Sequence, residues 1–98
     1  MSVVSISDEQ VGPVLEASPT SRAVIAAIRE LNAGVRLQDR GAYVRVLVTG
    51  RCHVTREAIE RALGAPFRLP GDLEIVMPSF KGKFSVSADE AVWEIVRR

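Results

Sequence analysis

The side chains that could do chemistry in this 98-residue chain are few. Cys52 and His53 are its single cysteine and its single histidine. Because neighbours on a β-strand point to opposite faces, they are expected neither to share a metal ion nor to form a nucleophile–base dyad. Ser79, Ser85 and Ser87 have no histidine in their segment and lie in no Gly-x-Ser-x-Gly elbow. The sequence therefore predicts no catalytic residue and no metal site.

The acidic residues and the glycines also lack the spacing of an active site. Glu57 and Glu60 share a predicted helix face with Arg56 and Arg61. This spacing predicts i,i+4 ion pairs such as Glu57–Arg61 on a solvated helix surface, not a buried carboxylate with a raised pKa. The glycines are spaced as turn and cap residues and form no Gly-x-Gly-x-x-Gly phosphate loop. No cofactor is expected.

Length and composition indicate one globular domain without a strong charge. We expect a mobile N-terminal arm over residues 1–10, which are polar and weakly patterned, and a single domain over residues 11–98. The formal net charge is +1, with 13 basic and 12 acidic side chains interspersed, which argues against nucleic acid and anionic membranes as partners. No stretch approaches the roughly 20 apolar residues of a membrane span, and no signal peptide is evident. Together with the single cysteine, these features predict a cytoplasmic protein.

Strong local sequence signals predict where the first helix begins and ends. Ser18 is the predicted N-cap, and Pro19 takes the first helical position, where a missing N–H does no harm. Gly34 is the predicted left-handed terminator, so the helix should end near Asn32 or Ala33. Its apolar stripe, spaced by three and four residues, consists of Val24, Ile25, Ile28 and Leu31.

Strands and a second helix are predicted for the following segment. Residues 42–49 alternate in polarity, Gly50 is placed for a turn, and residues 51–54 return as a shorter strand. Thr55 can cap a second helix that stops at Gly64. The apolar stripe predicted for this helix consists of Ile59, Ala62 and Leu63.

The ends of the chain read as β. Pro13 within the apolar run 11–16 favours an edge strand. Alternation predicts further strands over residues 73–77, 83–87 and 92–96. The predicted fold is α+β, an open two-layer sandwich of a mostly antiparallel sheet with two main helices on one face, in the order strand, helix, strands, helix, strands.

The sheet face opposite the helices would then be exposed. Tyr43, Arg45 and Leu47 fall on one side of the 42–49 strand and make that face a candidate contact surface. A small folded domain without nucleophile, metal ligands or cofactor loop most often works by binding another protein.

Several ordered motifs resemble one family of such partner proteins, the effector (coupling or regulatory) proteins of soluble multicomponent diiron monooxygenases. The resemblance covers about residues 11–96. Within the family, the chain is most similar to the toluene monooxygenase branch. The motifs that carry it, in order, are Val11–Val14, Asp39–Arg45, Thr55–Arg56, Leu63–Phe67, Leu73–Ile75 and Ser79–Gly82.

This resemblance implies a cofactor-free, non-catalytic subunit, monomeric when free, that docks on the diiron hydroxylase component. There it would couple oxygen activation to hydroxylation of a hydrocarbon, such as an aromatic compound or an alkene. In the family an Asn near the end of the first helix contacts the hydroxylase, and Asn32 occupies that place. Ser79 and Phe80 are carried over in the same way as partner-binding residues.

Two other classes of function compete with this interpretation. The first alternative is a small-molecule-sensing regulatory α+β domain, which would be an oligomer stabilised by its ligand. The second is single-stranded nucleic acid binding through Tyr43, Arg40, Arg45 and Arg51, which the low net charge disfavours.

Overall fold

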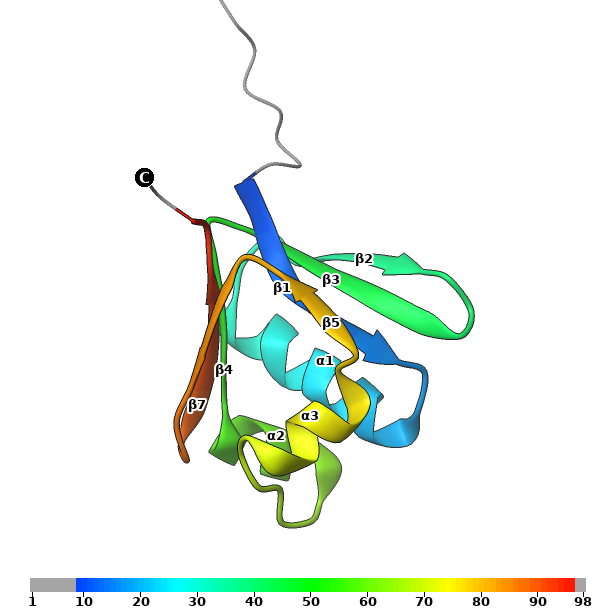
Figure 1. Ribbon diagram of the computed structural model, residues 1–98. Coiled ribbons are helices and arrows are strands. Elements are labelled where there is room, and N and C mark those ends of the chain that lie inside the picture. Colours follow the sequence, from blue (N-terminus) through cyan, green and yellow to red (C-terminus); the bar gives the residue numbers. More distant parts are fainter. Residues whose placement is uncertain (1–8, 97–98) are drawn as a thin grey trace, which may run out of the picture.

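The computed structural model describes residues 9–96, which form two antiparallel sheets and three helices (Figure 1). The elements are β1 (Gln10–Glu16), α1 (Pro19–Leu31), β2 (Arg36–Asp39), β3 (Tyr43–Thr49), β4 (Arg51–Thr55), α2 (Arg56–Leu63), α3 (Gly71–Val76), β5 (Ser79–Lys81), β6 (Lys83–Val86) and β7 (Glu90–Glu94). The predicted α+β class and the strand, helix, strands, helix, strands order are confirmed. Of the predicted arm, residues 1–8 lie outside the described residues, and Gln10 already begins β1.

The two sheets meet at a corner that the chain crosses twice. The larger sheet has the strand order β2-β3-β1-β5 and the smaller one β4-β7-β6. Gly50 joins β3 to β4, and Gly82 joins β5 to β6. Gly82 has φ +103°, and a Cβ there would lie 2.6 Å from the Glu94 carbonyl oxygen, so only glycine fits this bend.

The core fills the angle between the sheets, where Figure 1 shows the three helices. Its largest fully buried side chains come from every layer: Trp93, Phe67, Leu15, Ile28, Ile59 and Leu73. Because the helices lie within this angle, the other face of the larger sheet carries no helix from residues 9–96 (Figure 1). Within residues 9–96, no helix is long and apolar enough to cross a membrane.

Local capping signals confirm the predicted start of both main helices and the predicted end of α2. The first helix ends at Leu31 with Asn32 as an extended C-cap, so the left-handed Gly34 lies two residues beyond the cap and does not itself terminate the helix. The Ser21 backbone N–H donates to the Ser18 hydroxyl (3.0 Å), and the Ala58 N–H donates to the Thr55 hydroxyl (3.1 Å). Gly64 ends α2 in the left-handed conformation, with φ +74°. The predicted Glu57–Arg61 pair is present at 3.2 Å. In the stripe of α2, however, Ala62 is exposed and Ala58 is buried in its stead.

The strand predicted over residues 73–77 is wrong, because residues 71–76 form α3. Leu73, Val76 and Met77 are buried, whereas Ile75 is 73% exposed. The buried positions follow i, i+3, i+4 spacing, which is helical, but over five residues the same sequence also alternates. The short run did not distinguish the two periods.

The edge position predicted for the first strand is also wrong, since β1 lies between β3 and β5. The pairing of β1 with β3 stops after Val11 and resumes at Val14, and β5 pairs only with residues 12–14. Pro13, which has no N–H to donate, therefore lies where the ladder to β3 is interrupted. A proline can occupy a central strand at such a gap.

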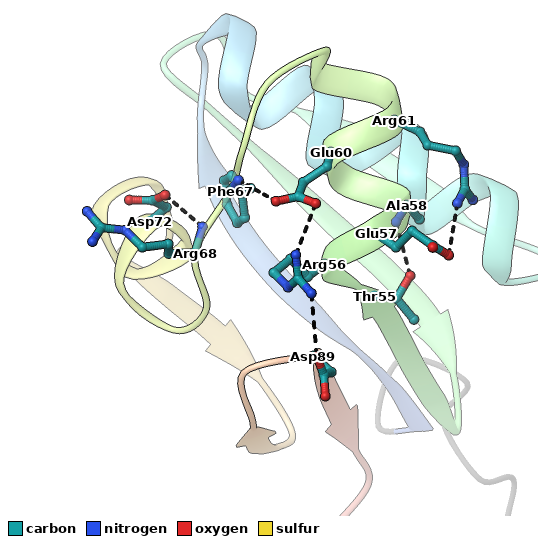
Figure 2. Close-up of polar contacts among 10 residues, drawn as sticks. All are labelled: Thr55, Arg56, Glu57, Ala58, Glu60, Arg61, Phe67, Arg68, Asp72 and Asp89. Atoms are coloured by element: carbon teal, nitrogen blue, oxygen red, sulfur yellow. Dashed lines mark hydrogen bonds and ion pairs between the residues drawn. The ribbon is translucent and has the colours of Figure 1, made fainter.

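Polar contacts fix the segment after α2 (Figure 2). Arg56 pairs with Glu60 at 3.1 Å and with Asp89 of the β6–β7 turn at 3.6 Å. The other carboxylate oxygen of Glu60 accepts from the Phe67 backbone N–H at 2.9 Å. Glu60 thus connects α2 to the buried Phe67, and Arg56 connects it to the smaller sheet.

Candidate functional site

The face of the larger sheet that carries no helix brings together four of the six residues predicted to bind a partner. Tyr43, Arg45 and Leu47 alternate along β3, and the register places Val14 between Arg45 and Ser79. We call this surface the outer sheet face. Its residues are Val14 and Glu16 of β1, Arg36 and Gln38 of β2, Tyr43, Arg45 and Leu47 of β3, and Ser79 and Lys81 of β5.

A furrow runs along the middle of the outer sheet face, over β1. Two hollows of about 380 Å³ and 190 Å³ lie along it; both are lined by Val14, Arg45 and Ser79, the first also by Tyr43 and the second also by Leu47. The floor is formed by Val14 of β1, joined in the smaller hollow by Gly12. The walls come from β3 on one side and β5 on the other, as the sheet order requires.

Gly12 makes this floor possible. Its φ is +149°, and a Cβ at this position would collide with the Val46 carbonyl oxygen of β3. The backbone of β1 therefore approaches β3 more closely than a residue with a side chain would permit. Gly12 also lines the smaller hollow, where it leaves open space above the sheet.

Phe80, the fifth predicted residue, lies at the rim of the furrow and begins a row of aromatic rings. Its neighbours Ser79 and Lys81 are on the outer sheet face, while Phe80 itself is opposite the buried Pro13. The Phe80 ring is 5.3 Å from that of Phe84, and Phe84 stacks on Trp93 at 5.2 Å. Phe80 is 45% exposed and Trp93 fully buried, so the row passes from the surface into the core.

Asn32, the sixth predicted residue, uses its amide inside the chain. Its Nδ2 donates to the carbonyl oxygens of Ile28 (2.8 Å) and His53 (2.7 Å), and its Oδ1 accepts from the His53 N–H (3.1 Å). The side chain thus pairs with the free edge of β4 as the peptide group of a neighbouring strand would. The structure does not bring Asn32 to the outer sheet face.

Cys52 and His53 are adjacent residues of β4, so their side chains lie on opposite faces of the strand. Cys52 is fully buried, and His53 is only partly buried. Burial raises the pKa of the Cys52 thiol to about 12, so the thiol is protonated at neutral pH and a poor nucleophile. Among residues 9–96, no cluster of three or more His, Cys, Asp or Glu side chains could hold a metal ion.

Sequence reasoning missed Arg36, Val14 and Lys81 as members of the surface. Arg36 faces Leu47 across β2 and β3, and Lys81 is opposite Gly12. Alternation within the Arg36–Asp39 strand could have indicated Arg36, because the short connection between β2 and β3 fixes the register of the two strands. The position of β5 beside β1 depends on a long-range pairing that no local signal marks.

These features define a small α+β domain with an open, furrowed sheet face, and the comparisons with known proteins give its family. Residues 9–94 match the MmoB/DmpM family, and the chain belongs to this family. It is 41% identical over 93 residues to the effector subunit of the alkene monooxygenase system of Xanthobacter autotrophicus (strain ATCC BAA-1158 / Py2), an alignment covering 93% of this chain and 91% of the relative.

Solved structures share the fold. A chain of a phenol hydroxylase–regulatory protein complex superposes with a TM-score of 0.77 at 24% identity, covering 87% of this chain and 95% of that chain. The soluble methane monooxygenase regulatory protein B superposes with a TM-score of 0.66 at 24% identity, covering 96% of this chain and 70% of that one. The family expected from the ordered motifs is confirmed by the family match over residues 9–94 and by the 41% identical relative.

Proposed function

We propose that this chain is the effector subunit of a multicomponent monooxygenase, an accessory protein that binds the diiron hydroxylase component without catalysing a reaction itself. The observation that carries the proposal is the 41% identity, over nearly the whole length of both chains, to a protein named as an effector subunit. The alternative of a small-molecule sensor has no comparable support. The hydrocarbon that the system hydroxylates, including the toluene branch expected from the motifs, stays a prediction.

The effector would act by differential binding. A partner shifts the conformations of a hydroxylase only by as much as its affinity differs between them. An effector that prefers the form competent to activate oxygen therefore raises the population of that form, and more of the electrons consumed end in product. This action requires a rigid, shaped surface and no cofactor of its own.

The outer sheet face is the surface we propose for docking. Tyr43, Arg45, Leu47 and Ser79 lie on it, and Phe80 lies at its rim. The face carries no helix, and its furrow offers concave apolar space beside an arginine, the pairing of features common at interface hot spots. Asn32 remains a proposed partner residue, but its internal bonds mean that its effect on affinity must be separated from its effect on folding.

Reconstitution tests the proposal. The purified chain is mixed with its cognate hydroxylase and electron-transfer components, and product formed per electron consumed is measured with and without it. We expect the chain to raise this ratio. An unchanged rate and ratio with the complete set would refute the effector function.

A matched pair of variants tests the docking face. Leu47→Ala removes a half-buried side chain from the furrow, and Ile75→Ala removes a side chain of similar size, 73% exposed, from α3. Removing a hot-spot side chain costs more than about 1 kcal/mol, or roughly fivefold in Kd. We expect this loss for Leu47→Ala and an unchanged Kd for Ile75→Ala. Equal Kd values for both variants would place the docking surface elsewhere.

Location and assembly follow from the same proposal. We infer a cytoplasmic, monomeric subunit that binds neither nucleic acid nor membranes. The buried thiol of the single cysteine and the low net charge support this. Size-exclusion chromatography of the free chain tests its monomeric state.

A further inference from the structure

Two arginines of the outer sheet face, Arg36 and Arg45, form no ion pair with another of the described residues 9–96. Ion pairs join Arg51, Arg56 and Arg61 to carboxylates of the helices and of the smaller sheet and its turn. Arg36 and Arg45 are both exposed, on neighbouring strands. The near-neutral net charge of the chain therefore conceals a locally positive face.

The register shows how these charges surround the furrow. Arg36 is opposite Leu47, Arg45 lies between Gln38 and Val14, and Lys81 is opposite Gly12. Cations thus stand on both sides of an apolar strip that runs over β1. Glu16, beside Tyr43 at the end of the strip, is the one carboxylate that strand alternation places on this face within the described residues.

We propose, resting on the effector function above, that the outer sheet face recognises an acidic patch of the hydroxylase. Carboxylates of that patch would pair with Arg36 and Arg45, and an apolar side chain beside them would enter the furrow. Arginine forms bidentate bonds with carboxylates, and such complementary charges set the orientation and the rate of association. Arg36 becomes a specificity-determining residue of the interface.

The same face is a poor match for a polyphosphate. Three cations around an apolar strip give no extended basic track, and Tyr43 is the single aromatic side chain on the face within residues 9–96, so stacking of successive bases is not supported. A protein surface that presents both carboxylates and an apolar group fits better than a nucleic acid.

Zero-length cross-linking tests the contact with carboxylates directly. A carbodiimide activates a carboxylate, which then forms an amide with a lysine amine in contact with it. The chain has two lysines, Lys81 on the outer sheet face and Lys83 on β6. Lys81→Arg and Lys83→Arg each keep the charge and remove one reactive amine. We expect the hydroxylase cross-link, located by mass spectrometry, to persist in Lys83→Arg and to lose its Lys81 site in Lys81→Arg.

Charge reversal tests the arginines. Arg45→Glu and Arg36→Glu are compared with Arg22→Glu, an exposed residue of α1. We expect the two outer-face variants to raise Kd for the hydroxylase by about tenfold or more, and Arg22→Glu by less than about twofold. Added salt should weaken hydroxylase binding by the wild type more steeply than binding by Arg45→Glu. Salt screens the attraction between Arg45 and the acidic patch, and this attraction is already absent in the variant.

The outcomes separate the two proposals. A wild-type chain that neither binds nor stimulates the hydroxylase refutes the effector function itself. A chain that binds and stimulates, but whose affinity is insensitive to salt and to Arg36→Glu and Arg45→Glu, overturns the acidic-patch inference and leaves the effector function standing. Binding of a single-stranded oligonucleotide as tight as that of the hydroxylase would also overturn it.

Discussion

Replacing Asn32 should destabilise the fold, because its amide makes three hydrogen bonds, two of them to the free edge of β4. Asn32→Ala removes three hydrogen bonds, to Ile28 and to both backbone groups of His53. Asn32→Asp keeps the shape but replaces a donor with a charged acceptor that faces two carbonyl oxygens. The two variants together separate loss of bonds from repulsion.

The magnitude follows from the bonds. Each typically contributes about 0.5–1.5 kcal/mol, and water reaches part of this half-buried site, so we expect Asn32→Ala to lower the free energy of unfolding by about 2–3 kcal/mol. In a domain of this size, 1 kcal/mol corresponds to about 4–8 °C in Tm, which predicts a drop of roughly 10–20 °C. Asn32→Asp should be less stable still at pH 7 and should approach Asn32→Ala as its carboxyl is protonated at low pH.

Thermal and urea unfolding followed by circular dichroism measure these changes, and Kd for the hydroxylase is then determined well below the lowered Tm. A Tm of Asn32→Ala within about 3 °C of the wild type would refute the reasoning. A folded Asn32→Ala chain with normal affinity would show that Asn32 shapes the effector without touching the hydroxylase.

Three other changes test the structure. Gly12→Ala, which forces a Cβ into the backbone of β3, should cost about 3 kcal/mol or more or prevent folding, as measured by urea unfolding; a wild-type midpoint would contradict the close approach of β1. The Cys52 thiol, with a pKa raised from 9.0 to about 12, should resist alkylation at pH 8 until the chain unfolds. Because the thiol of the unfolded chain ionises at a lower pH than that of the folded chain, the contribution of Cys52 to the free energy of unfolding is full below pH 9 and is lost as pH rises from 9 towards 12. Glu60→Ala should lower the free energy of unfolding, measured by thermal unfolding, by about 1–2 kcal/mol, because Glu60 holds the segment after α2. Its matched control Glu57→Ala should lower it by less than about 0.5 kcal/mol, because Glu57 makes an exposed ion pair. Equal losses in the two variants would refute this distinction.

Features with local causes could be predicted from the sequence. The caps at Ser18 and Thr55 and the stop at Gly64 depend on neighbours within a few residues, so both helix boundaries followed directly. The alternation along β3 likewise indicated which side chains share a face. The exposed surface followed once two helices had to cover one side of the sheet.

Features that depend on distant pairing could not be predicted. The amide of Asn32 meets a strand 21 residues away, which changes the residue from a free helix end to an internal connection. The pairing of β5 with β1 forms the second wall of the furrow, and nothing in the sequence of the Ser79–Lys81 segment indicates that it pairs with β1. Over residues 73–77, a five-residue alternation fitted both periods, and burial of Leu73 and Val76 decided for the helix.

The aromatic row from Phe80 to Trp93 gives the protein an optical probe of its own. Trp93 is the single tryptophan of the chain, fully buried, and within residues 9–96 its indole N–H has no hydrogen-bond partner. Its emission therefore originates from one apolar environment, and it is linked through the Phe84 ring to a phenylalanine at the rim of the proposed docking face. Fluorescence of the unlabelled chain can thus report both the unfolding of the smaller sheet and any displacement of Phe80 at the surface.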